Sequence, residues 1–132
     1  MKKRGLTLLR VSYITGAVLD FINFILFLFP SAFLSLFGRD NVFITSELKV
    51  MFNVSASLMF AWTVLLIWGF LKPFERKGLL LITVLPVMAG LIYTTVNSTV
   101  IGITTFDKIL PLLINQTIIV VLFIVSYFYS EK

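Results

Sequence analysis

The sequence predicts an all-α membrane protein: a bundle of four transmembrane helices with a short interfacial helix after the first span. Of the 132 residues, 59% are hydrophobic, and the mean hydropathy is +1.05. A soluble domain of this length would leave much of that apolar surface in water and would aggregate. Four apolar stretches also reach the roughly 20 residues that a helix needs to cross a bilayer. Only helices satisfy their own backbone groups segment by segment in lipid, so all four are predicted to be helical.

The predicted spans cover residues 6–29, 48–71, 78–101 and 109–129 of a single domain, 1–132. We expect the first span to be retained, because its apolar stretch is too long for a signal peptide and no small-residue cleavage site follows it. Pro30 ends this span. Residues 30–38 then combine a proline suited to a first helical turn, apolar residues on one side and Gly38 as a stop. This pattern predicts a helix lying along the outer interface, and a simple tight connection is the alternative.

The distribution of Lys and Arg predicts the orientation. One side of the predicted bundle carries Lys2, Lys3, Arg4, Arg10, Lys72, Arg76, Lys77 and Lys132, and the other carries Arg39, Lys49 and Lys108. The positive-inside rule therefore predicts that both termini lie in the cytoplasm, and we expect the membrane to be a bacterial cytoplasmic membrane. The net charge of +5 lies at the ends of the apolar segments, which favours contact with membrane lipid over nucleic acid.

The chain contains no Cys and no His. This composition excludes thiol–disulfide chemistry and haem held by His, and it removes the usual metal ligands and the usual general base. We therefore expect no cofactor and no metal site, and we predict no catalytic residue.

Asp20 is the main candidate for a functional residue. It lies about nine residues, or about 13 Å, from the outer end of the first span. A carboxylate at that depth is costly unless it is paired, hydrated or protonated. The three-and-four spacing of a helix places it on one face with small, polar and aromatic residues, namely Tyr13, Gly16, Ala17, Asn23, Phe24 and Phe27. We expect this face to point into the bundle.

The other three spans also carry polar groups in their outer halves, whereas their inner halves carry only hydroxyls. With Asp20 and Asn23, these groups predict a ligand-binding or proton site; they are Asn53, Ser57, Tyr93, Thr94, Asn97, Asn115 and Gln116. Its predicted wall consists of Tyr13, Gly16, Phe24, Phe27 and Phe60. Pro86 and Gly90 would allow the third helix to bend beside it. The alternative is purely structural: the amides join helices, and Asp20 bonds to Asn53 or Asn115.

The layout resembles the DoxX-like group of small bacterial four-helix membrane proteins. The matching features are the first span containing Gly16, its exit through Phe29-Pro30, and the following Leu36-Phe37-Gly38. The resemblance covers the whole chain as architecture. It implies a four-helix fold and assigns no site.

These features favour a binding or accessory protein that holds a lipid-like or other apolar ligand, or a membrane protein partner. The alternative is a proton-coupled transporter that uses Asp20 and works as a homodimer, because four helices are few for alternating access within one chain. Small multidrug resistance transporters likewise combine four helices with one carboxylate in the first span, although theirs is a Glu. An enzyme acting on a lipid is the third hypothesis, and it would have few groups for acid–base chemistry.

Overall fold

The computed structural model describes residues 2–130, with side chains from residue 4 onward, and this part of the chain folds into helices without strands. The elements are α1 (Lys2–Leu28), α2 (Pro30–Leu36), α3 (Ser46–Leu71), α4 (Gly78–Ile82), the π-helix η1 (Thr83–Met88), α5 (Ala89–Val100) and α6 (Phe106–Tyr129). The segments α4, η1 and α5 follow one another directly and form the third long helix. The side chains of Lys2 and Lys3, and Lys132, which the orientation prediction uses, lie outside the described residues.

Within residues 2–130, four helices are long and apolar enough to cross a membrane. Their most apolar windows have mean hydropathies of 1.8, 1.9, 2.2 and 2.4, and only 22–28% of each window is buried inside the protein. Most of the remaining surface is large aliphatic or aromatic side chain, which suits contact with lipid and not with water. The prediction of four helices of spanning length is confirmed.

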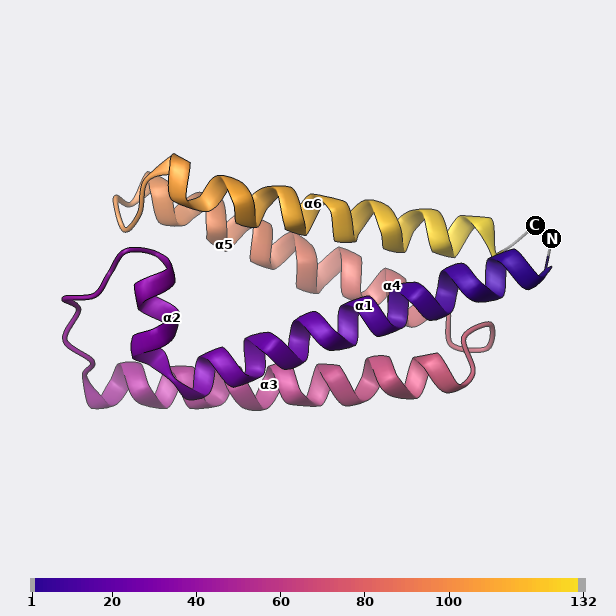
Figure 1. Ribbon diagram of the computed structural model, residues 1–132, viewed down its shortest axis with the longest axis horizontal. Helices are drawn as coiled ribbons and strands as arrows, with labels where there is room; N and C mark the ends of the chain where they lie inside the picture. Colours follow the sequence, from indigo (N-terminus) through magenta and orange to yellow (C-terminus); the bar gives the residue numbers. More distant parts are fainter. Residues whose placement is uncertain (1, 131–132) are drawn as a thin grey trace.

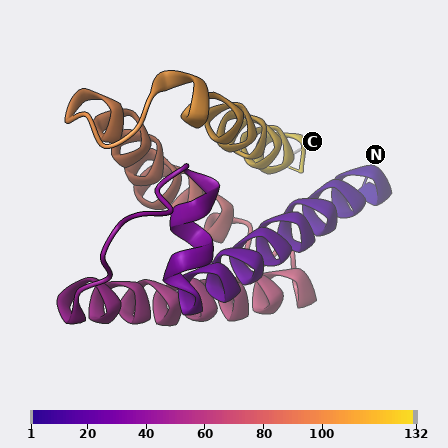
Figure 2. The same cartoon turned by 60° about the vertical axis from the view of Figure 1, so that its left-hand side comes forward.

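The helices form two halves that meet at one end (Figure 1). The first half consists of α1, α2 and α3, and the second half of α4, η1, α5 and α6. Both described chain ends and the turn from α3 to α4 lie at the same end of the molecule, which we call the terminal end. At the opposite end, called the α2 end, the halves diverge and α2 stands between them, as Figure 2 also shows.

Glycines and hydroxyls hold the terminal end together. The ring of Tyr13 lies directly against Gly69 of α3, and its hydroxyl donates a hydrogen bond of 2.7 Å to the carbonyl oxygen of Arg76. Ser126 donates to Leu122 at 2.7 Å, and its Oγ lies 2.5 Å from the Oγ of Ser12, which joins α1 to α6. Small and hydroxylated residues at helix crossings allow the backbones to approach and bond without water.

A further contact in this region joins α3 to the third long helix. The indole Nε1 of Trp62 donates to Thr83 at 3.2 Å, and Thr83 in turn donates to the carbonyl oxygen of Leu79 at 2.8 Å. The sequence indicated only scattered hydroxyls at this end of the bundle. The structure shows that they make the polar contacts between the halves.

The helix α2 confirms the prediction of a short helix after the first span, and it ends at Leu36. Pro30 stands in its first turn, and Gly38 follows its end with φ +66°. The amides of Gly38 and Arg39 donate to the carbonyl oxygens of Ser35 and Leu34 at 2.8 and 3.0 Å. This pairing is a Schellman motif, in which glycine adopts the left-handed conformation at lowest cost.

Aromatic rings attach α2 to the first half. The ring of Phe33 lies 4.9 Å from Phe27 of α1, 5.4 Å from Phe52 of α3 and 5.1 Å from Phe37, measured between ring centroids. These are ordinary distances for edge-on and tilted aromatic pairs. We call Phe27, Phe33, Phe37 and Phe52 the α2 aromatic cluster. It ties α2 to α1 and α3, while the side chain of Lys108 on α6 lies against Gly38, just after α2.

Candidate functional site

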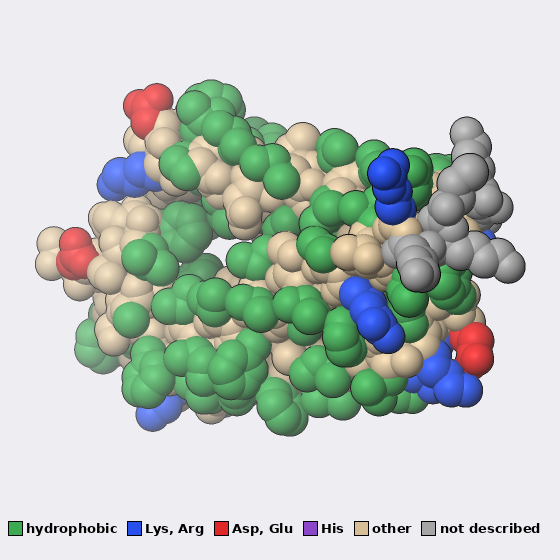
Figure 3. Space-filling view, turned by 45° about the vertical axis from the view of Figure 1, so that its right-hand side comes forward, with side chains coloured by type: hydrophobic (Ala, Val, Ile, Leu, Met, Phe, Trp, Pro, Cys, Tyr) green, Lys and Arg blue, Asp and Glu red, His purple; other side chains and the backbone are tan. Residues whose placement is uncertain are grey.

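A cavity of about 120 Å³ lies between the two halves. Residues of α1, α3, η1, α5 and α6 line it: Gly16, Leu19, Asp20, Ile22, Asn23, Leu66, Thr83, Met88, Leu91, Leu112, Asn115, Gln116, Ile119 and Phe123. Figure 3 shows the surface hollowed between the halves toward the α2 end. The space suffices for several water molecules or for a small polar group.

The cavity is closed toward the terminal end by close packing around Gly16. A methyl group at this position would lie 2.8 Å from Cζ of Phe123 and 3.0 Å from Cδ1 of Leu66. Real side-chain carbons do not approach so closely, so α1, α3 and α6 meet here only because residue 16 is glycine. Phe123 and Leu66 are themselves buried in the core. Ligand access from the terminal end is therefore blocked.

Four side chains with a carboxyl or amide group line the cavity from two helices, and the hydroxyl of Thr83, which also lines it, is already bonded to Trp62 and Leu79. Asp20 and Asn23 lie about one turn apart on α1, and Asn115 and Gln116 are neighbours on α6. Within the described part of the chain, Asp20, Asn23 and Asn115 make no side-chain hydrogen bond or ion pair. The structural interpretation in which Asp20 bonds to Asn53 or Asn115 is therefore wrong. These groups share one cavity, yet they do not satisfy one another.

Gln116 is the most buried of the four, at 6% exposed. Its Nε2 donates to the hydroxyl of Thr95 on α5 at 3.3 Å, while its Oε1 is buried without a hydrogen-bond partner among the described residues. A buried acceptor without a partner costs about 1–3 kcal/mol, and such groups are rare in native proteins. Gln116 therefore joins α6 to α5 beside the cavity and leaves its own oxygen unsatisfied.

Thr95 belongs to the site, although the sequence pattern did not predict it. Its hydroxyl donates to the carbonyl oxygen of Leu91 at 2.8 Å and accepts from Gln116, so it fixes the orientation of the amide. The predicted residue was its neighbour Thr94, which is exposed and bonds within its own helix to the carbonyl oxygen of Gly90. The pair Thr94-Thr95 carries no signal as to which hydroxyl faces α6.

The remaining predicted polar residues do not line the cavity. Asn53 and Ser57 are exposed on α3, where the Ser57 hydroxyl donates to the carbonyl oxygen of Asn53 at 3.0 Å. Tyr93 is 71% exposed, and Asn97 is half-buried elsewhere on α5. The predicted polar groups are therefore divided between one cavity and the outer surface of two helices.

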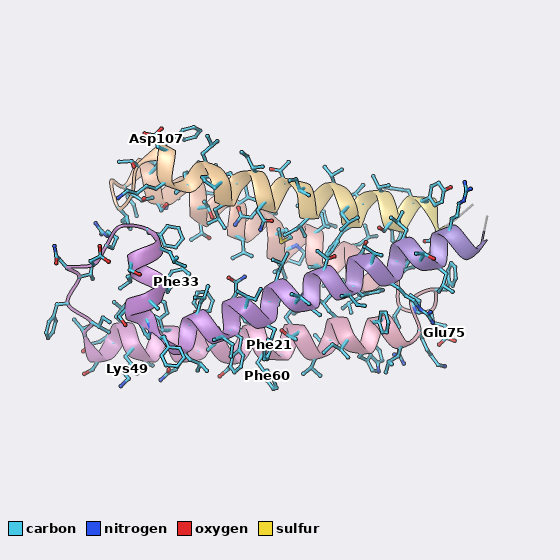
Figure 4. All side chains as sticks on the ribbon, in the orientation of Figure 1. Phe21, Phe33, Lys49, Phe60, Glu75 and Asp107 are labelled. Atoms are coloured by element: carbon cyan, nitrogen blue, oxygen red, sulfur yellow. The ribbon has the colours of Figure 1, made fainter. Side chains whose placement is uncertain are left out.

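The predicted aromatic wall also lies mostly elsewhere. Gly16 lines the cavity, but Tyr13 is buried at the terminal end, and Phe27 belongs to the α2 aromatic cluster. Phe24 packs against Phe60 with centroids 5.1 Å apart, and Figure 4 shows Phe60 on the side of α3 away from α5 and α6. Because α1 packs chiefly on α3, its aromatic residues turn toward that helix. The cavity wall is aliphatic, apart from Phe123.

Pro86 lies within the π-helix η1, so the third long helix is irregular where the sequence predicted flexibility. Proline removes a backbone donor, and a π-turn is one way to accommodate the loss. Gly90 lies in regular helix with open space beside it. Thr83 and Met88, the two ends of η1, both line the cavity. The irregular segment therefore forms part of the site.

The chain matches no protein-family model, no curated protein and no solved structure. The resemblance to DoxX-like proteins accordingly stays a prediction, and the site has to be interpreted from its own residues.

Proposed function

We propose that this protein spans a bacterial cytoplasmic membrane and binds an amphipathic, lipid-like ligand between its two halves. The polar end of the ligand would occupy the cavity, and its apolar part would leave toward the α2 end, where the halves diverge. The observation that carries the proposal is the set of four carboxyl and amide side chains on one cavity, three of which have no partner among the described residues.

The side chains that line the cavity support this function. Aliphatic side chains such as Leu19, Leu112 and Ile119 surround the polar groups, which suits a molecule that is apolar next to its polar end. The hollow between the halves gives such a molecule a route to the surrounding lipid (Figure 3). The lining contains one carboxylate, three amides and the hydroxyl of Thr83, and this set suits binding better than acid–base catalysis.

Replacing Asn115 with Leu tests the proposed function. The change removes one donor and one acceptor from the cavity and keeps the residue size. Because one hydrogen bond contributes about 0.5–1.5 kcal/mol, we expect the dissociation constant of the ligand to rise about 2- to 12-fold and the bound fraction of co-extracted ligand to fall. Native mass spectrometry of protein extracted from its own membrane measures this fraction as an adduct of constant mass.

Asn53→Leu is the matched control, because it removes an equivalent amide from the exposed face of α3. We expect its adduct to equal that of the wild type. An adduct that both variants retain, or that both lose, would contradict binding in this cavity.

The proposed orientation has the terminal end in the cytoplasm. In support, Arg4, Arg10, Lys72, Arg76 and Lys77 belong to the terminal end, whereas Arg39, Lys49 and Lys108 belong to the α2 end. Three of the first group lie over aromatic rings: Arg76 over Trp68, Lys77 over Tyr127 and Arg10 over Phe70, at 3.6, 5.0 and 5.6 Å. Cations held beside aromatic residues at helix ends are typical of membrane interfaces.

Single cysteines test this orientation against a clean background, because the chain has none of its own. Asn41→Cys places a thiol in the loop before α3, and Glu75→Cys places one in the turn before α4; both positions are exposed. We expect a membrane-impermeant maleimide to label residue 41 in intact spheroplasts and residue 75 only after lysis. The reverse pattern would overturn the orientation and leave the binding proposal intact.

A second candidate function is proton-coupled transport by a dimer, with Asp20 as the proton site. The observation that favours it is the lone carboxylate without a partner, placed where the halves diverge. Ligand accumulation in proteoliposomes that collapses with a protonophore would support transport. Binding without accumulation would leave the protein as a binding protein.

A further inference from the structure

We infer that the polar end of the ligand is a primary ammonium group on an apolar chain. This inference rests on the proposed function and names the class of ligand that the same cavity would take. It follows from three properties of the lining: its charge, its hydrogen-bonding capacity and its lack of an aromatic cage.

The cavity lining carries an acidic group and no basic group. Asp20 is the one ionisable residue in the lining, which includes no Lys or Arg. Within the described chain, Asp20 has no ion pair and no hydrogen bond. A half-buried carboxylate in apolar surroundings is costly as an anion unless a cation or water lies near it. A cationic ligand supplies the partner that the chain does not.

The lining offers several oxygens to a ligand that carries N–H donors. The carboxylate of Asp20 and the side-chain oxygens of Asn23 and Asn115 are acceptors, and the amide nitrogens of Asn23 and Asn115 are donors. The Nε2 of Gln116 is already used by Thr95. A primary ammonium carries three N–H donors and no acceptor, and it would donate to the carboxylate of Asp20 and to amide carbonyl oxygens of the lining.

The same lining disfavours other cations. A quaternary ammonium has no N–H donor and is normally held by several aromatic faces, whereas Phe123 is the one aromatic residue in this lining. A phosphoethanolamine headgroup would bring a phosphate close to Asp20 with no Lys or Arg in the lining to compensate. The geometry therefore favours a simple alkylamine over a zwitterionic lipid.

The test compares four amphiphiles on the full-length protein. The wild type in phosphatidylcholine nanodiscs is titrated with dodecylamine, dodecanol, dodecyltrimethylammonium and a phosphatidylethanolamine, and bound molecules are counted by native mass spectrometry. We expect one dodecylamine per chain, bound at least about ten-fold more tightly than each of the others, as is usual for a desolvated charge pair. Phosphatidylethanolamine binding as tightly as dodecylamine would assign the ammonium to a lipid and overturn the preference for a simple amine.

The variant Asp20→Asn keeps the shape of the side chain and removes its charge. We expect it to lose the ten-fold preference for dodecylamine over dodecanol, while Asn53→Leu retains it. If dodecanol equals dodecylamine on the wild type, the ammonium inference fails and the binding cavity stands. If no amphiphile binds the wild type, the proposed function fails as well. The comparison of the four amphiphiles on the wild type tests the ammonium inference by itself. It therefore holds even if Asp20→Asn folds poorly.

Discussion

Replacing Phe123 with Ala is expected to destabilise the bundle far more than truncating any lipid-facing side chain. The Phe123 side chain is 1% exposed and belongs to the core where α1, α3 and α6 meet. Its ring lies against Gly16 and forms part of the cavity wall. If the helices span a membrane as proposed, they stay inserted on unfolding, so the loss comes from packing and not from transfer to water. We expect about 2–4 kcal/mol, toward the low end for a buried phenylalanine.

Phe128→Ala is the control for this change, because Phe128 lies on the same helix and is 58% exposed. We expect its effect to stay within about 0.5 kcal/mol of the wild type, as for other surface positions. Both variants are measured by unfolding in mixed micelles of dodecylmaltoside and SDS, followed by the fluorescence of Trp62 and Trp68. Equal effects of the two substitutions would contradict the packing of α6 on α1.

The fold could be predicted from the sequence because hydropathy and helix-terminating residues determine it. An apolar stretch of spanning length has one backbone solution in lipid, and the four long helices follow from that constraint. The limits of α2 follow from Pro30 and Gly38, whose conformational preferences suit the two ends of a helix. Local chemistry therefore determined both the spans and the short helix.

The site could be predicted only in part. Depth along the spans correctly brought Asp20, Asn23, Asn115 and Gln116 to one level, and the structure places all four on one cavity. Depth does not tell which way a helix is rotated, however. In α3, which is apolar nearly all round, Asn53 had no contrasting face to reveal its direction, and it is exposed.

The third long helix shows a second reason why some predicted site residues do not line the cavity. The prediction placed Tyr93, Thr94 and Asn97 at the site on the spacing of a regular helix, with 3.6 residues per turn. The π-helix η1 interrupts that period, so the face of α5 cannot be extrapolated from α4. The residue that reaches α6 is Thr95, and Tyr93 points outward. A proline indicates that a helix is irregular, but it does not indicate the register that follows.

Gly69→Ala is expected to destabilise the interface between α1 and α3, whereas Gly90→Ala is not. A methyl group at residue 69 would lie 2.5 Å from Cε1, 2.9 Å from Cζ and 3.0 Å from Cδ1 of the Tyr13 ring. The ring cannot easily withdraw, because it is fully buried and its hydroxyl bonds the carbonyl oxygen of Arg76. Such overpacking costs about 1–3 kcal/mol.

At Gly90 nothing lies within 4 Å of the added methyl group, and the residue sits in regular helix. Alanine there gains about 0.5–1 kcal/mol of helix stability relative to glycine. The same substitution should thus shift the SDS midpoint in opposite directions at the two positions. Two shifts of the same sign would mean that α1 and α3 do not cross at Gly69. That crossing positions α1, so its loss would also remove the basis for placing Asp20 beside Asn115 and Gln116 of α6.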